Sequence, residues 1–256
     1  MNAQPDAPPT WLRRAQPLLG TLVEIGVPAA GAKAHAALDA AFAAVRELQA
    51  CLSRFEPDSD LARFHALRSG ESMPVRAPSR HVLAAARELQ DASDGAFDIS
   101  LGTAPDGWRC DGDRLHKLSD AVLIDLGGIG KGHAVDRAVE ALIANGCASG
   151  WANAGGDLRA FGDAELPIRL RDEASGGTRP FASLRDGAFA TSQYARQSRS
   201  QLAPHARHTG RRPVRAHVSV AAPLCLWADA LTKVIAISGD TAHPLLARFG
   251  AQAWLH

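Results

Sequence analysis

A glycine-rich stretch with one lysine is the part of the sequence best suited to bind phosphate. It runs from Ile124 to Asp136 and reads IDLGGIGKGHAVD. The apolar run 121–124 predicts a short buried strand, and apolar residues at helical spacing afterwards predict a helix that stops at Gly146. Glycines in the turn between them permit positive φ and let a ligand approach the backbone. The helix N-terminus adds free N–H groups and a positive dipole end, both suited to a phosphate.

Two common phosphate-binding motifs do not match this stretch. A Walker loop requires Ser or Thr after its lysine, whereas Gly132 follows Lys131. The dinucleotide fingerprint would need glycine at position 133, where His133 stands. A plain strand–turn–helix connection stays open as the alternative, although such a turn does not require Asp125 at its entrance.

Two other carboxylates have both a structural and a functional interpretation. Asp98 follows a turn at 94–97 that leads into a predicted short strand, and it either holds a sugar or ribityl hydroxyl or caps the next turn. Asp229 is predicted to lie in the first turn of a helix over 227–237, where a carboxylate favours the dipole. With Asp125, it is instead able to hold a hard cation through oxygen ligands.

A double glycine marks a further candidate ligand surface. Residues 151–162 predict two short strands kinked at Gly155 and Gly156, with Asn153 and Asp157 on either side. Either the kink is a β-bulge or its backbone offers a surface for a flat ligand.

The elements that position these residues are a mixture of helices and strands. A strand is predicted over 18–27, and an alanine-rich amphipathic helix over 32–52. Ser59 or Asp58 is expected to cap a short helix through Phe64, and another helix is expected over 79–92. Residues 101–117 have the glycine and proline content of a loop.

Positive charge is concentrated between Gly187 and Ala228. This segment has no Asp or Glu and contains Arg196, Arg199, Arg207, Arg211, Arg212, Arg215, His205, His208 and His217. It is either a solvated basic face or a site for a pyrophosphate or other polyanion. Nucleic acid is not expected as a partner, because no series of aromatic residues is interleaved with the arginines.

Length and composition fit one large domain or two small ones, with ample apolar content. The chain has 256 residues, is 46% hydrophobic and carries a formal net charge of +1, so bulk charge favours neither nucleic acid nor membrane. There is no run of about 18 apolar residues, hence no membrane span, and the polar start lacks a signal core. We therefore expect a cytoplasmic protein, with its four scattered cysteines reduced and mostly buried.

A series of blocks along the chain resembles a known family. The blocks are Leu19-Gly20-Thr21, Leu52-Ser53-Arg54-Phe55, Gly95-Ala96-Phe97-Asp98, Asp125 to Asp136, Asn153-Ala154-Gly155-Gly156-Asp157, Ala190-Thr191-Ser192, Thr209-Gly210 and Ala228-Asp229-Ala230-Leu231. In this order they resemble the motifs of the FAD:protein FMN transferases, the ApbE-type flavin transferases. The resemblance covers about residues 18 to 240, and we expect an N-terminal tail over 1–17 followed by a single domain over 18–256.

The resemblance implies a fold, a reaction and partners. The fold would be α/β (α+β), with mixed β-sheets and flanking helices around a cleft for FAD. The enzyme would use Mg²⁺ to split FAD, pass FMN to a Thr or Ser hydroxyl of an acceptor flavoprotein segment and release AMP. Metal and arginines would neutralise phosphate charge while the hydroxyl is oriented and deprotonated.

The resemblance also implies roles for individual residues. Those expected at FAD are Leu19, Ala96, Phe97, Asp98, Asp125, Lys131, Asn153, Gly155 and Gly156. The Gly128 carbonyl and the Asp229 carboxylate would be magnesium ligands. The catalytic candidates are His205 or His208, as general base, and Lys233.

Three departures from the family pattern keep other functions open. Lys233 stands where the family has a threonine, with Thr232 one residue too early. A charged lysine cannot ligate a cation, so Lys233 either substitutes its ammonium for one or abolishes the activity. The segment around His205 and His208 is two residues shorter and lacks an Asp and a Pro, and Gln193 follows Ser192 where the family has Gly-Asp. The alternatives are a flavin-nucleotide-binding protein without transferase activity, and an FAD pyrophosphatase that gives FMN to water.

Overall fold

The protein is built around a seven-stranded antiparallel sheet. The computed structural model describes residues 10–29, 31–172, 175–193, 214 and 217–256. The strands lie in the order β1-β2-β6-β7-β8-β9-β10. Their bounds are β1 Trp11–Leu18, β2 Thr21–Pro28, β6 Gly150–Ala154, β7 Asp157–Arg171, β8 Thr178–Gln193, β9 His217–Ala222 and β10 Gln252–Leu255. Every pair of neighbouring strands is antiparallel.

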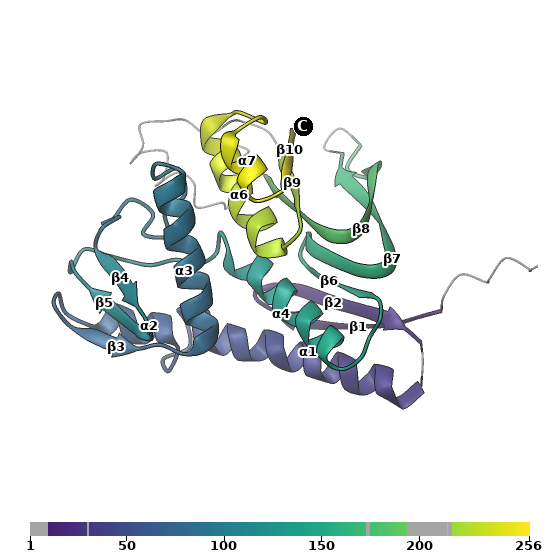
Figure 1. Ribbon diagram of the computed structural model, residues 1–256, viewed down its shortest axis with the longest axis horizontal. Helices are drawn as coiled ribbons and strands as arrows, with labels where there is room; N and C mark the ends of the chain where they lie inside the picture. The colour runs from purple at the N-terminus through teal and green to yellow at the C-terminus, as the bar shows by residue number, and fades with distance from the viewer. Residues whose placement is uncertain (1–9, 30, 173–174, 194–213, 215–216) are drawn as a thin grey trace, which may run out of the picture.

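In the described part of the chain, three helices lie beside one another and cover this sheet (Figure 1). They are α1 (Gly31–Leu52), α4 (Gly130–Ala144) and α6 (Cys225–Ser238). The expected apolar stripe of α1 is buried, with Leu38 and Phe42 at 0% exposure. Helix α6 is buried almost all round, as expected for a helix between two layers.

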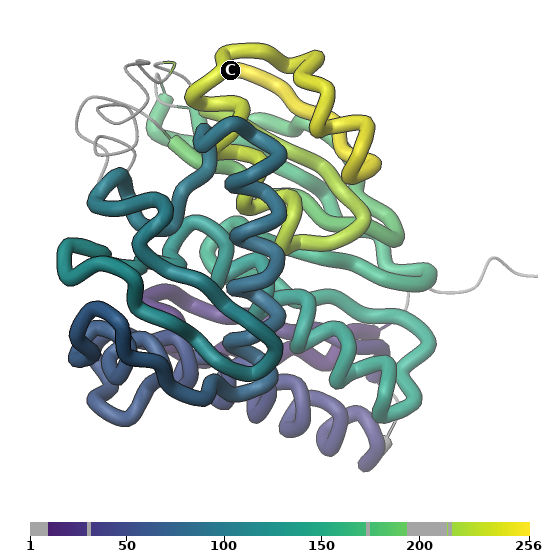
Figure 2. Tube along the Cα trace, turned by 60° about the vertical axis from the view of Figure 1, so that its left-hand side comes forward, coloured from purple at the N-terminus to yellow at the C-terminus, as the bar shows by residue number. Residues whose placement is uncertain are grey.

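A smaller unit lies beside the helices at one end of the molecule (Figures 1 and 2). It has a three-stranded sheet in the order β3-β5-β4 and two helices. Its elements are α2 (Asp60–Ala66), β3 (Ser72–Pro74), α3 (Ala77–Ala92), β4 (Trp108–Asp111) and β5 (Arg114–Lys117). The predicted cap of α2 is confirmed, since the Ala62 N–H donates to the Ser59 hydroxyl at 2.9 Å. A short helix, α7 (Pro244–Arg248), precedes β10.

Two apolar clusters form most of the core. One lies under α1, α4 and the large sheet, and the other joins the smaller unit to α6. Leu52 and Trp227 pack against both clusters, so the two parts share one continuous interior. The predicted α+β class with flanking helices is confirmed.

The N-terminal part of the chain differs from the expectation of a tail over 1–17. Residues 11–18 form β1, which pairs with β2 along its whole length. The strand predicted over 18–27 begins instead at Thr21, after a turn at Leu19 and Gly20. Because β1 is an edge strand, it tolerates Pro17 and several polar residues. These residues interrupt the apolar pattern by which a strand is predicted from sequence.

Three local predictions around the centre of the chain were wrong. Residues 121–124 are extended but form no strand, because the Ile124 N–H donates to His65 Nε2 at 3.0 Å and not to a neighbouring strand. Residues 98–100 form a turn without a strand. The expected loop 101–117 contains β4 and β5.

The cysteines match the expectation of reduced and mostly buried thiols only in part. All four cysteines are free thiols, but only Cys51 and Cys225 are buried, while Cys110 and Cys147 are partly exposed. Among the residues that the structure describes, no helix has both the length and the apolar content to cross a membrane.

Candidate active site

A cavity of about 870 Å³ opens where the two parts of the molecule meet. Its walls come from the turn before β2, the end of α1, the segment 97–101, the glycine-rich stretch, the end of β8 and helix α6. The apolar side chains in this wall are Leu19, Leu48, Leu52, Phe55, Leu61, Phe97, Ile99, Leu101 and Leu126. Lys131 and Lys233 contribute positive charge to the same cavity.

In the central stretch, Gly132 and Gly128 serve close packing, and no glycine there is required for positive φ. Helix α4 begins at Gly130, so Lys131 and Gly132 lie in its first turn. None of the glycines in this stretch has positive φ, which corrects that expectation. A Cβ on Gly132 would lie 2.3 Å from the Cys225 carbonyl oxygen, and one on Gly128 would lie 3.3 Å from Lys233 Cε. Glycine at 132 therefore lets α4 approach α6 closely.

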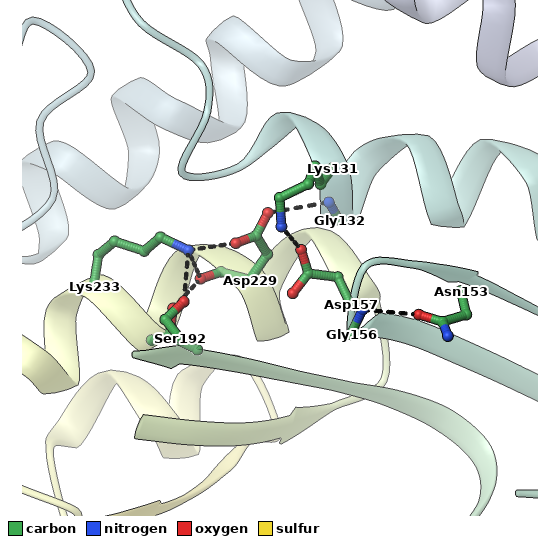
Figure 3. A network of polar contacts seen from close by, with 9 residues as sticks. Lys131, Gly132, Asn153, Gly156, Asp157, Ser192, Asp229 and Lys233 are labelled. Atoms are coloured by element: carbon green, nitrogen blue, oxygen red, sulfur yellow. Dashed lines mark hydrogen bonds and ion pairs between the residues drawn. The ribbon is translucent and has the colours of Figure 1, made fainter. Parts of the chain in front are cut away.

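Two lysine–aspartate pairs stand at the polar part of the cavity (Figure 3). Lys131 Nζ contacts Asp157 Oδ2, and Lys233 Nζ contacts Asp229 Oδ1. Asp229 Oδ2 accepts the Gly132 N–H at 3.1 Å, which ties α6 to the first turn of α4. Asp229 lies in the second turn of α6, not the first as expected.

Burial and charge oppose each other in this network. Burial and then the charge of Asp229 raise the pKa of Asp157 to about 6. Burial disfavours the charged form of Lys131, but the Asp229 and Asp157 carboxylates outweigh it and raise its pKa. Asp229 is completely buried, yet the ammonium groups of Lys233 and Lys131 lower its pKa. Both carboxylates are therefore held in place by lysine charge that also faces the cavity.

Asp125 is one of the residues that line the cavity. Its Oδ1 accepts the Gly127 N–H at 2.7 Å, and its Oδ2 lies 3.5 Å from Arg54 Nη1. The first contact fixes the glycine turn, and the second brings another cation to the cavity wall.

Leu19 and Phe97, which the resemblance assigns to FAD, both lie in the cavity wall. Leu19 has φ +56°, and its N–H donates to Gln49 Oε1 at 2.7 Å. A branched side chain with positive φ is uncommon and costs free energy, so the surrounding contacts hold Leu19 in this position.

Asp98 and Ala96 serve the local backbone. Asp98 is fully buried and accepts the Ser100 N–H at 2.7 Å and the Gly102 N–H at 2.9 Å, so the capping interpretation is confirmed. Asp98 also touches the cavity, whereas Ala96 is buried and is not among its lining residues.

The double glycine forms a tight hairpin turn between β6 and β7. Gly155 and Gly156 both have positive φ, and the Gly156 N–H donates to Asn153 Oδ1 at 2.9 Å. A Cβ on Gly155 would lie 2.6 Å from the Thr21 hydroxyl. These residues are not among those that line the cavity, but the turn places Asp157 against Lys131.

Comparison with known proteins places the chain in a family. The sequence model of the ApbE family matches residues 19–123 and 110–255. The chain belongs to the ApbE family. It is 27% identical over 231 residues to an FAD:protein FMN transferase of Treponema pallidum, covering 70% of this chain and 63% of that protein. It is 30% identical over 207 residues to one of Rhodobacter capsulatus, covering 66% and 39%.

A solved structure supports the same fold. The apo form of the Pseudomonas stutzeri flavinyl transferase ApbE superposes with a TM-score of 0.80 at 24% identity, covering 96% of this chain and 91% of that chain. The chain spans less than two thirds of the length of the two transferases named above.

Several predicted residues lie outside the described part of this ApbE-family chain. His205 and His208, and the arginines of the basic segment up to Arg212, lie outside the described residues, as does Arg215. Ser192 and Gln193, at the start of that segment, do line the cavity with Gly128.

Two carboxylates that support the cavity wall are not among the candidates predicted from the sequence. Asp157 was noted only as a residue beside the double glycine, yet it is the partner of Lys131. Asp136, at the end of the central block, accepts the N–H groups of Cys225 and Leu226 at 2.9 and 2.8 Å and so caps α6. The carboxylates in both blocks were the available signal, but which lysine or helix end they meet depends on tertiary structure.

Proposed function

We propose that the protein is an FAD:protein FMN transferase that moves FMN from FAD to a Thr or Ser hydroxyl of an acceptor protein and releases AMP. The names of its relatives in Treponema pallidum and Rhodobacter capsulatus support this proposal. The main observation in its favour is that Lys131, Lys233 and an extensive apolar surface line the same cavity.

The cavity has the size and character that a dinucleotide requires. Its 870 Å³ is near the upper end of the ~300–1,000 Å³ range of small-molecule sites. The apolar residues suit a flavin ring, and Lys131 at the N-terminus of α4 suits a phosphate. We infer that the diphosphate lies at the glycine-rich stretch, with Asp125 and Phe97 beside the bound FAD.

The reaction requires a new oxygen–phosphorus bond. The acceptor hydroxyl oxygen would attack the phosphorus of the FMN half, and the bond to the AMP phosphate would break. Lys131, Lys233 and the N–H groups of α4 would stabilise the charge that develops on the phosphate oxygens. The hydroxyl proton would pass to His205 or His208, which stay our candidates for the general base.

The described donors do not fit a magnesium ion between Gly128 and Asp229. Both Asp229 carboxylate oxygens are already engaged, one by Lys233 and the other by the Gly132 N–H. Within the described parts of the chain, no three His, Cys, Asp or Glu side chains come together in a way that could hold a metal. No step of the proposed reaction is therefore assigned to a metal here.

Transfer is tested by following the flavin. Purified protein is incubated with FAD and a candidate acceptor, and a denaturing gel is inspected for flavin fluorescence on the acceptor. A fluorescent acceptor band with release of AMP is expected. AMP without a labelled acceptor would instead indicate an FAD pyrophosphatase, and tightly bound intact FAD would indicate a flavin-binding protein. The cytoplasmic location and the absence of nucleic acid partners stay predictions.

A further inference from the structure

Lys233 makes several contacts with oxygen atoms at one position. Its ammonium contacts Asp229 Oδ1, the Asp229 carbonyl oxygen at 2.9 Å and the Ser192 hydroxyl at 3.3 Å (Figure 3). The Ser192 hydroxyl lies 2.9 Å from that of Thr232, which donates to the Asp229 carbonyl oxygen at 2.6 Å. A carboxylate, a carbonyl and one hydroxyl therefore surround the Lys233 ammonium. Together they form an oxygen-rich cation site whose cation is an ammonium group.

We propose that Lys233 is the resident cation of this site and that the protein binds FAD without a divalent metal. The inference rests on the proposed function only in taking FAD as the ligand. It reverses the magnesium expectation for the positions of Gly128 and Asp229.

Burial supports this role for Lys233. The Asp229 side chain is 0% exposed and that of Lys233 is 14% exposed, so the carboxylate depends on the ammonium for its compensating charge. A divalent cation at Asp229 Oδ1 would either displace Lys233 or lie against another positive charge. Neither arrangement is favourable in a buried site.

Lys233 also lies beside Gly128, the residue of the second expected metal ligand. The stem of Lys233 lies against Gly128, where a Cβ would be 3.3 Å from Lys233 Cε and 3.6 Å from Phe97. The side chain therefore fills the space between Gly128 and Asp229. Because Lys233 also lines the large cavity, its charge is available to a bound diphosphate.

The test compares metal binding by the wild type and by Lys233→Thr. Free Mn²⁺ is measured by electron paramagnetic resonance in a titration of each protein saturated with FAD. The wild type is expected to bind no more Mn²⁺ than FAD alone. Lys233→Thr removes the charge and adds a hydroxyl, so it is expected to bind Mn²⁺ at least about tenfold more tightly. Lys33→Thr, which changes an exposed lysine of α1, is the matched control and should behave as the wild type.

A second measurement does not depend on the folding of the variant. FAD affinity of the wild type, followed by flavin fluorescence, is expected to be equal in EDTA and in Mg²⁺. Loss of wild-type FAD affinity in EDTA, or Mn²⁺ binding by the wild type as tight as that of Lys233→Thr, would overturn the proposal. If FAD does not bind at all, the proposed function fails, and Mn²⁺ titration without FAD still tests the metal site.

Discussion

At the scale of single residues, the site depends on charges that compensate one another. Asp157 is almost fully buried, and the Lys131 side chain that faces it is 34% exposed. Removing one partner of a buried ion pair leaves an uncompensated charge, which costs more than the pair itself contributes. The pair is therefore a sensitive test of whether this network holds the glycine-rich stretch against β7.

We predict that Lys131→Met lowers the free energy of unfolding by about 2–3 kcal/mol, a value reduced from that of fully buried pairs because water reaches Lys131. Urea unfolding at pH 8 measures the change. Asp157→Asn removes the carboxylate charge that Lys131→Met leaves uncompensated. The variant with both substitutions is therefore expected to recover about half of the lost free energy of unfolding. Equal stability of the single and double variants would show that the pair is not coupled.

A second residue links stability to pH. His133 in α4 is 3% exposed and stacks on His81 of α3, with ring centroids 4.9 Å apart. Its Nε2 has no hydrogen-bond partner among the described residues. Burial, followed by the charges of His81 and Arg137, lowers the pKa of His133 to about 3. Glu88 and Glu140 face the same small cavity, but they do not reverse this shift.

The folded and unfolded states bind a proton at His133 in different pH ranges, so stability depends on pH. Below about pH 6.5 an unfolded histidine binds a proton, whereas folded His133 stays neutral until about pH 3. Stability is therefore lost as pH falls from 6.5 towards 3, by up to about 1.4 kcal/mol per pH unit. When the pH is lowered from 7 to 5, the free energy of unfolding measured in urea should fall by up to about 2 kcal/mol less in His133→Phe than in the wild type. Parallel pH profiles of the two proteins would rule out this account.

At the scale of elements, α4 and α6 meet through a glycine. Gly132 and Gly130 lie in the same turn of α4, but only Gly132 has no room for a side chain. A Cβ at 132 would be 2.3 Å from a backbone oxygen of α6, whereas a Cβ at 130 would lie 3.7 Å from the Leu52 side chain. The two positions form a natural matched pair.

We predict that Gly132→Ala destabilises the protein by about 1–3 kcal/mol or more, because α6 must move away from α4. Gly130→Ala makes ordinary contacts and gains helix propensity, so it should be neutral or stabilising by up to about 1 kcal/mol. Thermal unfolding compares the two. Similar effects of both substitutions would contradict the packing role assigned to Gly132.

The elements show what sequence could predict and what it could not. Helix α1 was predicted almost to its ends because its apolar residues repeat at helical spacing over 22 residues. A strand was wrongly predicted over 121–124, because buried and exposed residues alternate there as they do in a strand. The segment is extended, but it pairs with no neighbouring strand. Strand β1 was missed because an edge strand needs no apolar alternation.

The site itself was only partly predictable. The glycine-rich stretch, Lys131 and Asp229 could be chosen as candidates, because their residue types and their order along the chain are visible in the sequence. The pairing of Lys131 with Asp157 joins residues 26 apart, and that of Gly132 with Asp229 joins residues 97 apart. Such contacts depend on how α4, β7 and α6 pack, which local sequence does not encode.

At the scale of the whole molecule, the large cavity joins the two apolar clusters. Its wall includes Leu48 of the cluster under the large sheet and Phe97 and Ile99 of the other. A ligand in this cavity contacts both parts, so binding should stabilise the molecule as one unit.

We predict that FAD at about 100 times its dissociation constant raises stability by about 2.7 kcal/mol. For a chain of this size, the melting temperature should rise by about 5–10 °C. AMP, which carries only part of the ligand, should give a smaller shift at equal concentration. Differential scanning fluorimetry is unsuited to a fluorescent flavin, so circular dichroism is the measurement. An unchanged melting temperature at saturating FAD would contradict the assignment of this cavity.

The most direct test of the account is a crystal structure of the protein with FAD. We predict that the diphosphate lies at the N-terminus of α4, within hydrogen-bond distance of Lys131, and that the flavin lies against Phe97. FAD bound elsewhere, with the cavity between the two parts left empty, would contradict it.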